Sequence, residues 1–272
     1  MNAFIGDLQS LVRYRHLIRN LAATQLKLRY HRSLLGICWT LLNPLLLLGV
    51  QAVAFSQILN LNIKAYALYL LSGIVVWHFF SNAIESSSRT LISNEGLIRA
   101  IPTPKFVFPL SDLLVSLAHS GFALAAFFIL TPIFGGEINE QMILLPAAVV
   151  LLALFTFGIS LVTMTLMTLF RDFAHIIGVL LTALYFASPI LYPPELINRF
   201  RVMLQWNPLS YYLDLFHAAL SPVTALTPGG ATVPPMWPSA FTWAVAIGCS
   251  LGALLVGYAT YKKFEHEYIY HL

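Results

Sequence analysis

Long apolar runs separated by short polar stretches dominate this chain. Each run approaches or exceeds the roughly 20 residues that a helix needs to cross the hydrocarbon core of a membrane. Since the backbone polar groups of a segment in lipid must bond within the chain, helices are the expected form. The pattern predicts an all-α membrane protein with six membrane-spanning helices, over residues 34–59, 66–84, 113–134, 142–170, 173–191 and 240–261.

A different periodicity precedes the first predicted span. Apolar side chains recur on one helical face, with Gln25 as the exception, and basic or polar side chains occupy the opposite face. Residues 1–33 are therefore predicted to form an amphipathic interface helix at the cytoplasmic headgroups, ahead of a transmembrane domain over residues 34–272. A topology signal with a lipid anchor explains this helix, and a docking surface for a cytoplasmic partner is compatible with it. Its apolar face consists of Leu11, Tyr14, Ile18, Leu21 and Leu28.

Composition and charge support a membrane protein and give it an orientation. Of 272 residues, 58% are hydrophobic and 10% are charged, whereas soluble domains carry about 25% charged residues. Of the 15 Lys and Arg residues, all but Lys64, Arg199 and Arg201 fall on one side of the predicted spans. Because cytoplasmic loops are enriched in Lys and Arg, both termini are predicted to be cytoplasmic, with the chain in the cytoplasmic (inner) membrane. This bias accounts for the net charge of +4, so nucleic-acid binding is not indicated.

The loop after the second span, about residues 93–105, is predicted to contain a short helix. Asn94 can cap it, Glu95 lies in its first turn, and Pro102 and Pro104 follow its end. Its apolar side chains could insert into a groove on another protein, and an interfacial turn is the alternative. Those apolar residues are Leu97, Ile98 and Ile101.

The sequence offers no catalytic or metal-binding motif. It has no GxxxxGK[ST], HExxH or GxSxG pattern and no Cys/His/Asp cluster with metal-ligand spacing. His78, His119 and His175 each stand alone, which favours structural roles. Acidic residues are absent from the centres of the predicted spans, which argues against a carrier coupled to protons or sodium. If transport is the activity, its energy source is expected outside this chain.

The fifth predicted span ends abruptly. It opens with RDFAHI and stops at SPILYPP, where Pro189, Pro193 and Pro194 break the helix near the predicted outer surface. Non-helical backbone at membrane depth is tolerated only against protein or a water-filled cavity. The break therefore favours a lined passage, with a plain helix stop at the interface as the alternative.

These features together, with WNPLSYYLDLFH in the loop that follows, resemble the permease subunits of type-2 ABC transporters that export polysaccharides. Such exporters carry O-antigen, capsule or teichoic acid. The resemblance covers nearly the whole chain, and its most specific parts are Arg171-Asp172, Ser188-Pro189-Ile190 and Asn207-Pro208-Leu209. None of these is a catalytic signature, so the specificity comes from their order and spacing.

The resemblance implies a homodimer that works with two copies of a separate cytoplasmic ABC ATPase subunit. ATP and magnesium would bind to that partner, so no cofactor is expected in this chain, and a lipid-linked glycan would be the cargo. It also implies short hairpin helices on the outer side, in a gate region over about residues 189–238. The implied ATPase-coupling residues are Glu95, Leu97, Ile98, Arg99, Arg13 and Arg19, and the implied gate residues are Pro189, Pro193, Pro194, Trp206, Asn207 and Pro208.

Candidate pathway residues follow from the chemistry of sugars, which have polar hydroxyls and apolar C–H faces. Tyrosine can stack on the latter and bond the former. Tyr185, Ser188 and Tyr192 would share one face of the fifth helix, and Thr156, Ser160 and Thr163 make a weakly polar stripe on the fourth. Aromatic belts at the interface and helix packing through small polar residues are the alternatives.

Two other functions remain open from the sequence. One is a type-2 ABC permease for a small lipophilic compound or drug. The other is a membrane-embedded enzyme acting on lipid-linked sugars, which would need a juxtaposed acid, base or metal site near the interface. No convincing site of that kind occurs in the sequence.

Overall fold

The computed structural model describes residues 10–30, 38–101, 103–134, 140–194, 201–220, 225–226, 232–233 and 237–271. The predictions made for residues 1–9, 31–37, 102, 195–200, 221–224, 227–231 and 234–236 lie outside these residues. In chain order the elements are α2 (Arg15–Tyr30), α3 (Cys38–Ile58), α4 (Ile63–Ser93), α5 (Glu95–Ala100), α6 (Val107–Ile133), η1 (Glu140–Leu144), α7 (Leu145–Leu169), α8 (Phe173–Ala187), α9 (Arg201–Trp206), α10 (Pro208–Leu220), β1 (Ala225–Leu226), β2 (Thr232–Val233), α11 (Ala240–Phe264) and α12 (Tyr268–His271).

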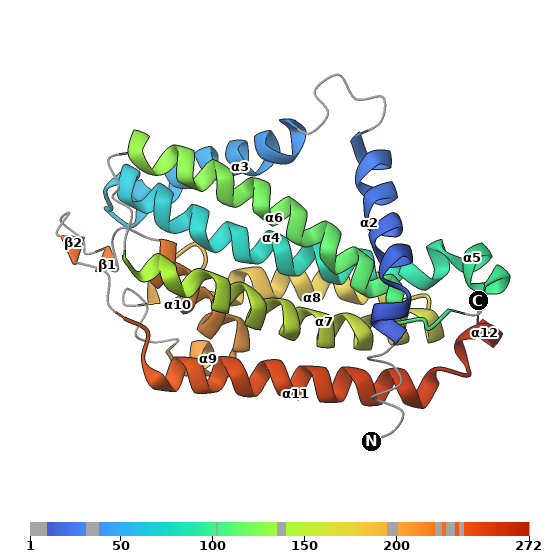
Figure 1. Cartoon of the computed structure of the whole chain (residues 1–272). Coiled ribbons are helices and arrows are strands. Elements are labelled where there is room, and N and C mark those ends of the chain that lie inside the picture. Colours follow the sequence, from blue (N-terminus) through green and yellow to red (C-terminus); the bar gives the residue numbers. More distant parts are fainter. Residues whose placement is uncertain are drawn as a thin grey trace.

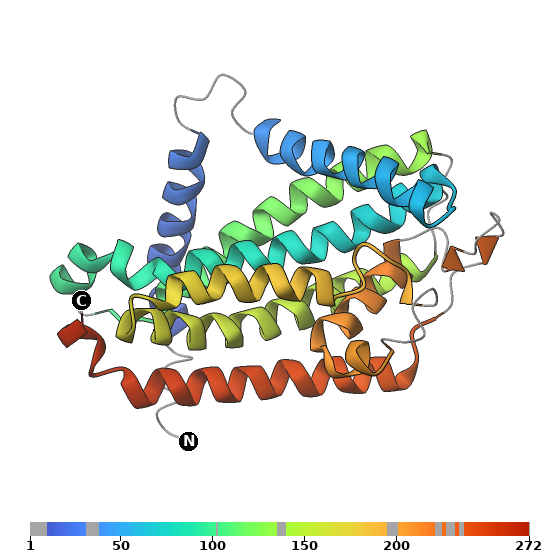
Figure 2. The ribbon, with the colours of Figure 1, turned by 180° about the vertical axis from the view of Figure 1, so that it is seen from behind.

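The long helices run roughly alongside one another as a bundle, and α2 lies across one end of it (Figure 1). The short helices α5 and α12 lie at this same end, which we call the α2 end. Helices α9 and α10 and the strands β1 and β2 lie toward the opposite end, which we call the α10 end. Seen from behind, α8 lies on the face of the bundle between α3 and α11 (Figure 2).

The chain is a multi-pass membrane protein. Within the described residues, α4, α6, η1 with α7, and α11 are long and apolar enough to cross a membrane. The predicted spans over 34–59 and 173–191 correspond to the shorter helices α3 and α8. With 15 residues, α8 is about 22 Å long, less than the roughly 30 Å of a hydrocarbon core.

Two details depart from the predicted all-α fold with a fifth span to residue 191. Helix α8 ends at Ala187, because Ser188 precedes a proline and adopts an extended conformation. The strands β1 and β2 pair antiparallel over two residues each, ahead of α11.

Helix α2 packs against the bundle through its apolar face. Ile18 is buried in a cluster with Leu91 and Phe106, whereas Leu28, near the other end of α2, is exposed. Gln25, the exception in the apolar pattern, donates a hydrogen bond from Nε2 to Oδ1 of Asp112 at 2.8 Å. A buried carboxyl group near the start of α6 therefore has a partner on α2, which explains a polar residue on that face.

The short helix α5 forms where the sequence predicts it, but its cap differs. Asn94 occupies the cap position without a side-chain bond to the helix, because its Nδ2 donates instead to the carbonyl of Thr90 at the end of α4. Asn94 thus joins α4 and α5, and Ile101 is extended directly after α5.

The C-terminal helix α12 is tied to the α2 end by one buried tyrosine. The hydroxyl groups of Tyr268 and Thr165 lie 2.7 Å apart, which connects α12 to α7. Burial raises the pKa of Tyr268 to about 12, so the phenol remains protonated at neutral pH.

Helices α7 and α11 cross closely at two glycines. A Cβ on Gly257 would overlap the carbonyl oxygen of Gly158, and a Cβ on Gly158 would overlap the backbone of Ala253. Small residues let helix backbones approach in this way when both helices are surrounded by lipid. Gly248, nine residues or about two and a half turns earlier on α11, has no atom near the position of a Cβ.

These contacts predict opposite effects for two identical substitutions on α11. Gly257→Ala should destabilise the protein by about 1–3 kcal/mol, because backbone must move apart to admit the methyl group. Gly248→Ala should be neutral or slightly stabilising, because alanine favours a helix more than glycine does. Thermal unfolding of the detergent-solubilised variants measures both, and equal midpoints would contradict the close packing.

Candidate functional site

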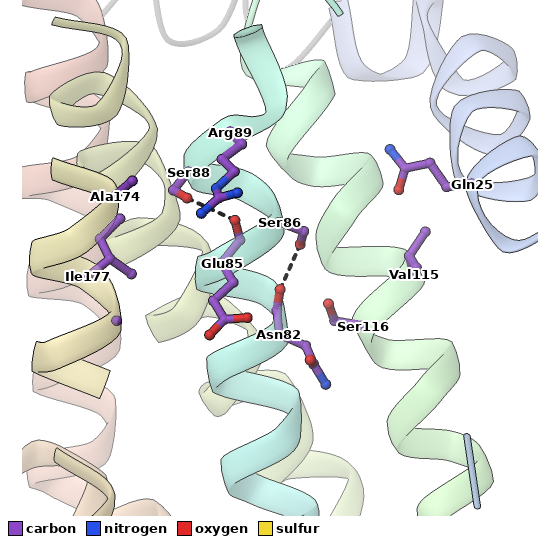
Figure 3. A pocket seen from close by; sticks show the side chains of 11 residues that line it. Gln25, Asn82, Glu85, Ser86, Ser88, Arg89, Val115, Ser116, Ala174 and Ile177 are labelled. Carbon is purple, nitrogen blue, oxygen red and sulfur yellow. Dashed lines mark hydrogen bonds between the residues drawn. The ribbon is translucent and has the colours of Figure 1, made fainter. Parts of the chain in front are cut away.

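Two adjoining cavities follow α4. The first has a volume of about 470 Å³ and is lined by α2, α4, α6 and α8 (Figure 3). The second has a volume of about 310 Å³ and is lined by α3, α4 and α8. Glu85 and Gly178 line both. We call them the α2-side cavity and the central cavity, and we call the two together the α4 groove.

The α4 groove exists because α4 has one polar face. Trp77, Ser81, Glu85 and Arg89 recur every four residues, so they follow one side of the helix. The rest of the helix is mostly buried against its neighbours. Further polar lining comes from Gln25, Asn82, Ser86, Ser88 and Ser116 in the α2-side cavity, and from Gln51, His78 and Thr182 in the central cavity.

Tyr185 forms the aromatic wall of the central cavity. Its ring centroid lies 5.2 Å from that of Trp77, and the rings are inclined at 59°. Its hydroxyl oxygen accepts a hydrogen bond of 2.9 Å from Nε2 of Gln51 on α3. This pair of rings beside amide and hydroxyl groups offers both stacking and hydrogen bonding, which is the combination that sugar rings require.

Ser188 and Tyr192 do not continue the helical face of Tyr185, because α8 has already ended. The hydroxyl of buried Ser188 donates to the carbonyl of Leu184 at 2.7 Å. The hydroxyl of Tyr192 donates to the carbonyl of Phe186 at 3.1 Å. Neither residue lines the two cavities.

The turn over residues 188–194 is held to α4 by hydrogen bonds. Tyr66 donates to the carbonyl of Leu191 at 2.6 Å, and Tyr69 donates to those of Pro189 and Tyr192 at 3.0 and 3.2 Å. Non-helical backbone is thereby satisfied by side chains of a neighbouring helix. Pro189 and Pro193 are buried in this turn, and Pro194 is exposed.

The two motifs SPI and NPL contact each other directly. Asn207 donates from Nδ2 to the hydroxyl oxygen of Ser188 at 2.9 Å, and its Oδ1 accepts from the amide of Leu209 at 3.0 Å. Pro208 is the first residue of α10, where a missing N–H costs nothing. Trp206, the last residue of α9, is 84% exposed and makes no part of this contact.

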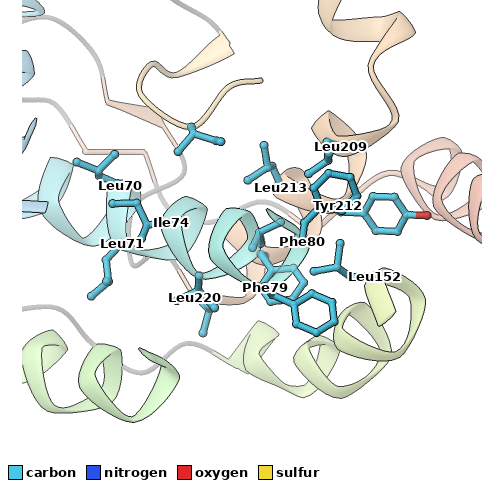
Figure 4. Packing of buried hydrophobic residues seen from close by; sticks show 14 of the residues in the cluster. Leu70, Leu71, Ile74, Phe79, Phe80, Leu152, Leu209, Tyr212, Leu213 and Leu220 are labelled. Carbon is cyan, nitrogen blue, oxygen red and sulfur yellow. The ribbon is translucent and has the colours of Figure 1, made fainter. Parts of the chain in front are cut away.

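Helix α10 packs its apolar side chains against α4 and α7 (Figure 4). His217 stacks on Tyr69 with a centroid distance of 4.0 Å, and its Nδ1 lies 2.7 Å from the hydroxyl of Ser72. Asp214 accepts from the hydroxyl of Thr242 at 3.0 Å, at the start of α11. Burial raises the pKa of Asp214, and the hydrogen bond from Thr242 opposes that shift.

The polar stripe on α7 lies elsewhere. Thr156 and Ser160 are fully buried and Thr163 is nearly so, and none of them lines the α4 groove. Their position matches the alternative weighed from the sequence, in which small polar residues accompany helix packing.

At the α2 end, the expected coupling residues divide into two groups. Leu97 and Ile98 are half-buried against the cluster around Ile18 and Leu91 of their own chain. Glu95 and Arg99 form an exposed ion pair of 2.9 Å. Arg13 and Arg19 are also exposed.

The groove contains residues that the sequence did not single out as pathway residues: Gln51, Trp77, His78, Glu85 and Arg89. The sequence favours a structural role for His78, and the structure places it in the lining of the central cavity. The recurrence of polar residues every fourth position on α4 is the sequence signal that could have identified them.

Known proteins with similar sequences match most of this chain. The profile of the family described as "ABC-2 type transporter" matches residues 16–220. The "O-antigen export system permease protein RfbA" of Myxococcus xanthus is 28% identical over 213 residues, which cover 77% of this chain and 82% of that protein. A Klebsiella pneumoniae protein of the same name is 27% identical over 197 residues, covering 70% and 76%. The "Polysialic acid transport protein KpsM" of Escherichia coli is 26% identical over 213 residues, covering 73% and 78%.

The contact between the two motifs gives a test. Asn207→Ala should loosen the 188–194 turn, because it removes a buried hydrogen bond and the cap of α10, at a cost of about 1–3 kcal/mol. Hydrogen–deuterium exchange of this turn and of the Leu209 amide should then rise roughly tenfold or more. Gln205→Ala, an exposed position nearby, should leave the exchange unchanged. Protection that persists in Asn207→Ala would refute the role of this contact.

Proposed function

The chain belongs to the ABC-2 type transporter family, and on this premise we propose that it moves a lipid-linked polysaccharide, such as an O-antigen-like glycan, across the cytoplasmic membrane. It is a permease, a transporter component rather than an enzyme. The names of its relatives, which refer to O-antigen export and polysialic acid transport, support a glycan cargo.

The α4 groove is the observation that carries this proposal. It combines stacking rings at Trp77 and Tyr185 with hydrogen-bonding groups at Gln51, Ser81 and Glu85. A groove for a small lipophilic compound would not need a carboxylate and an amide beside its rings. A polymer of hydroxylated rings could contact such a surface repeatedly without any single tight site.

We place the α2 end at the cytoplasm. Exposed basic residues gather there, on α2 and at the ends of α4 and α5, as expected for a cytoplasmic face. The 188–194 turn and α9–α10 would then form the outer gate region. A cargo would enter by the α2-side cavity and pass through the central cavity toward this turn.

A second copy of the chain would complete the passage. In the single chain Glu85, Ser86 and Arg89 are exposed, so the groove has one open side. The helices α3 and α8 that flank the central cavity carry exposed apolar residues, among them Val50, Val179 and Phe186. A homodimer with the two grooves facing each other would shield these polar residues from lipid.

The driving force would come from two copies of a separate ABC ATPase subunit, which bind ATP and magnesium. Arg99 lies on α5 and Ile101 directly follows it. Both side chains are exposed, so they are available for contact with another protein. Leu97 and Ile98 pack against Leu91 and Ile18. A movement imposed on α5 would therefore reach both α2 and the end of α4, where the groove begins.

Two variants separate the passage from the coupling contact in a strain that lacks the native permease but keeps its ATPase. Tyr185→Ala should lower surface glycan roughly fivefold, because a stacking ring contributes about 1 kcal/mol, while Tyr185→Phe should retain most export. Neither change should alter co-purification of the ATPase.

Arg99→Glu combined with Ile101→Asp should instead lower both export and ATPase co-purification, with normal membrane insertion of the permease. If wild-type protein fails to restore surface glycan, or exports a lipophilic drug instead, the proposed function is wrong. Full export by the Arg99/Ile101 double variant would remove α5 from the coupling contact.

A further inference from the structure

Glu85 occupies the junction of the two cavities. It is one of two residues that line both. Helix α4 is about 46 Å long, and Glu85 lies about 10 Å from its midpoint at His78, toward the α2 end. Glu85 directly follows the span predicted over residues 66–84 and is exposed in the single chain, so a cargo that moves from the α2-side cavity into the central cavity passes its carboxylate.

Among the described residues, no Lys or Arg accompanies the Glu85 carboxylate in the lining of the central cavity. Among the described lining residues, Glu85 and Arg89 are the formally charged ones in the α2-side cavity, and Glu85 is the only one in the central cavity. His78, seven residues earlier on α4, is a titratable base that also lines the central cavity. In the part of the chain that the structure describes, Glu85 forms no ion pair.

Figure 3 shows that the Glu85 carboxylate extends toward the turn of Asn82. The guanidinium of Arg89 lies nearer the α2 end than the Glu85 carboxylate does (Figure 3). A cargo that moves from the α2-side cavity into the central cavity therefore passes Arg89 first and then meets the negative charge of Glu85, and no Lys or Arg is among the described residues that line the central cavity.

We infer that Glu85 makes this passage selective for uncharged sugar units. Its two carboxylate oxygens accept hydrogen bonds from sugar hydroxyls, and bonds to a charged acceptor are the stronger kind. The same carboxylate repels sugar units that carry carboxylates of their own, because like charges at close range repel each other. This inference rests on the proposed glycan export and specifies the class of glycan that is exported. The relatives leave that class open, because their names refer to both O-antigen and polysialic acid.

The test compares two cargoes that share the same sugar backbone and differ at C6, where one carries a neutral hydroxymethyl group and the other a carboxylate. Inverted membrane vesicles containing the permease and its ATPase receive a lipid-linked galactose polymer, or the same polymer oxidised at C6 to carboxylates. Wild-type protein should translocate the neutral polymer at least about tenfold faster than the oxidised polymer, and this ratio of rates is the quantity measured. Glu85→Gln, which keeps the size and removes the charge, should narrow this ratio to about threefold or less. Ser81→Asp, which adds a carboxylate one turn further along the groove, should widen it.

Glu140→Gln is the matched control, because Glu140 is exposed on η1 and lines neither cavity. It should leave the ratio unchanged. Equal translocation of both polymers by wild-type protein, or an unchanged ratio in Glu85→Gln, would overturn the assignment while glycan export itself stands. If wild-type vesicles translocate neither polymer, the proposed function fails and this inference fails with it.

Discussion

A membrane-spanning helix cannot expose a polar face to lipid, and this constraint on α4 organises the rest of the structure. Most of α4 is buried, and its remaining face carries a carboxylate, a guanidinium, hydroxyls and an amide. Such groups are tolerated at membrane depth only where they face water, protein or cargo. The helices α2, α3, α6 and α8 meet this requirement by leaving cavities along α4 rather than closing on it.

The two ends of α4 are anchored differently. At the α10 end, Tyr66 and Tyr69 bond the carbonyls of the 188–194 turn, and His217 stacks beside them. The prolines of that turn supply no N–H groups, so its backbone needs donors and α4 provides them. At the α2 end the contacts of α4 are mainly those of Leu91 in a small apolar cluster with α2, α5 and α6. A force applied to α5 would therefore act on the less extensively bonded end of the groove.

The sequence predicted the order of the apolar helices, the amphipathic α2 and the short α5, because these depend on local periodicity. It could not predict where α8 ends or that Ser188 contacts Asn207, since that hydrogen bond joins residues 19 positions apart. The sequence also offers the stripe of Thr156, Ser160 and Thr163 as pathway candidates, whereas the structure places the stripe of Ser81 along the groove. The stripe of Thr156 and the stripe of Ser81 look alike in sequence, and only the placement of neighbouring helices buries one and leaves the other beside a cavity. Tyr185, a pathway residue predicted from the sequence, lines the central cavity, and its partner Trp77 lies outside the predicted set.

Photo-crosslinking from two positions of α4 tests most directly whether the α4 groove carries the cargo. Benzoylphenylalanine would replace either Trp77, which lines the central cavity, or Phe79, which is buried on another face against α6 and α7. The two positions lie on the same helix and their native side chains are both large and aromatic. During ATP-driven export, the reagent at position 77 should crosslink to the lipid-linked glycan and the reagent at position 79 should not. Crosslinking at 79 alone, or at neither position while export continues, would contradict a passage along this face of α4.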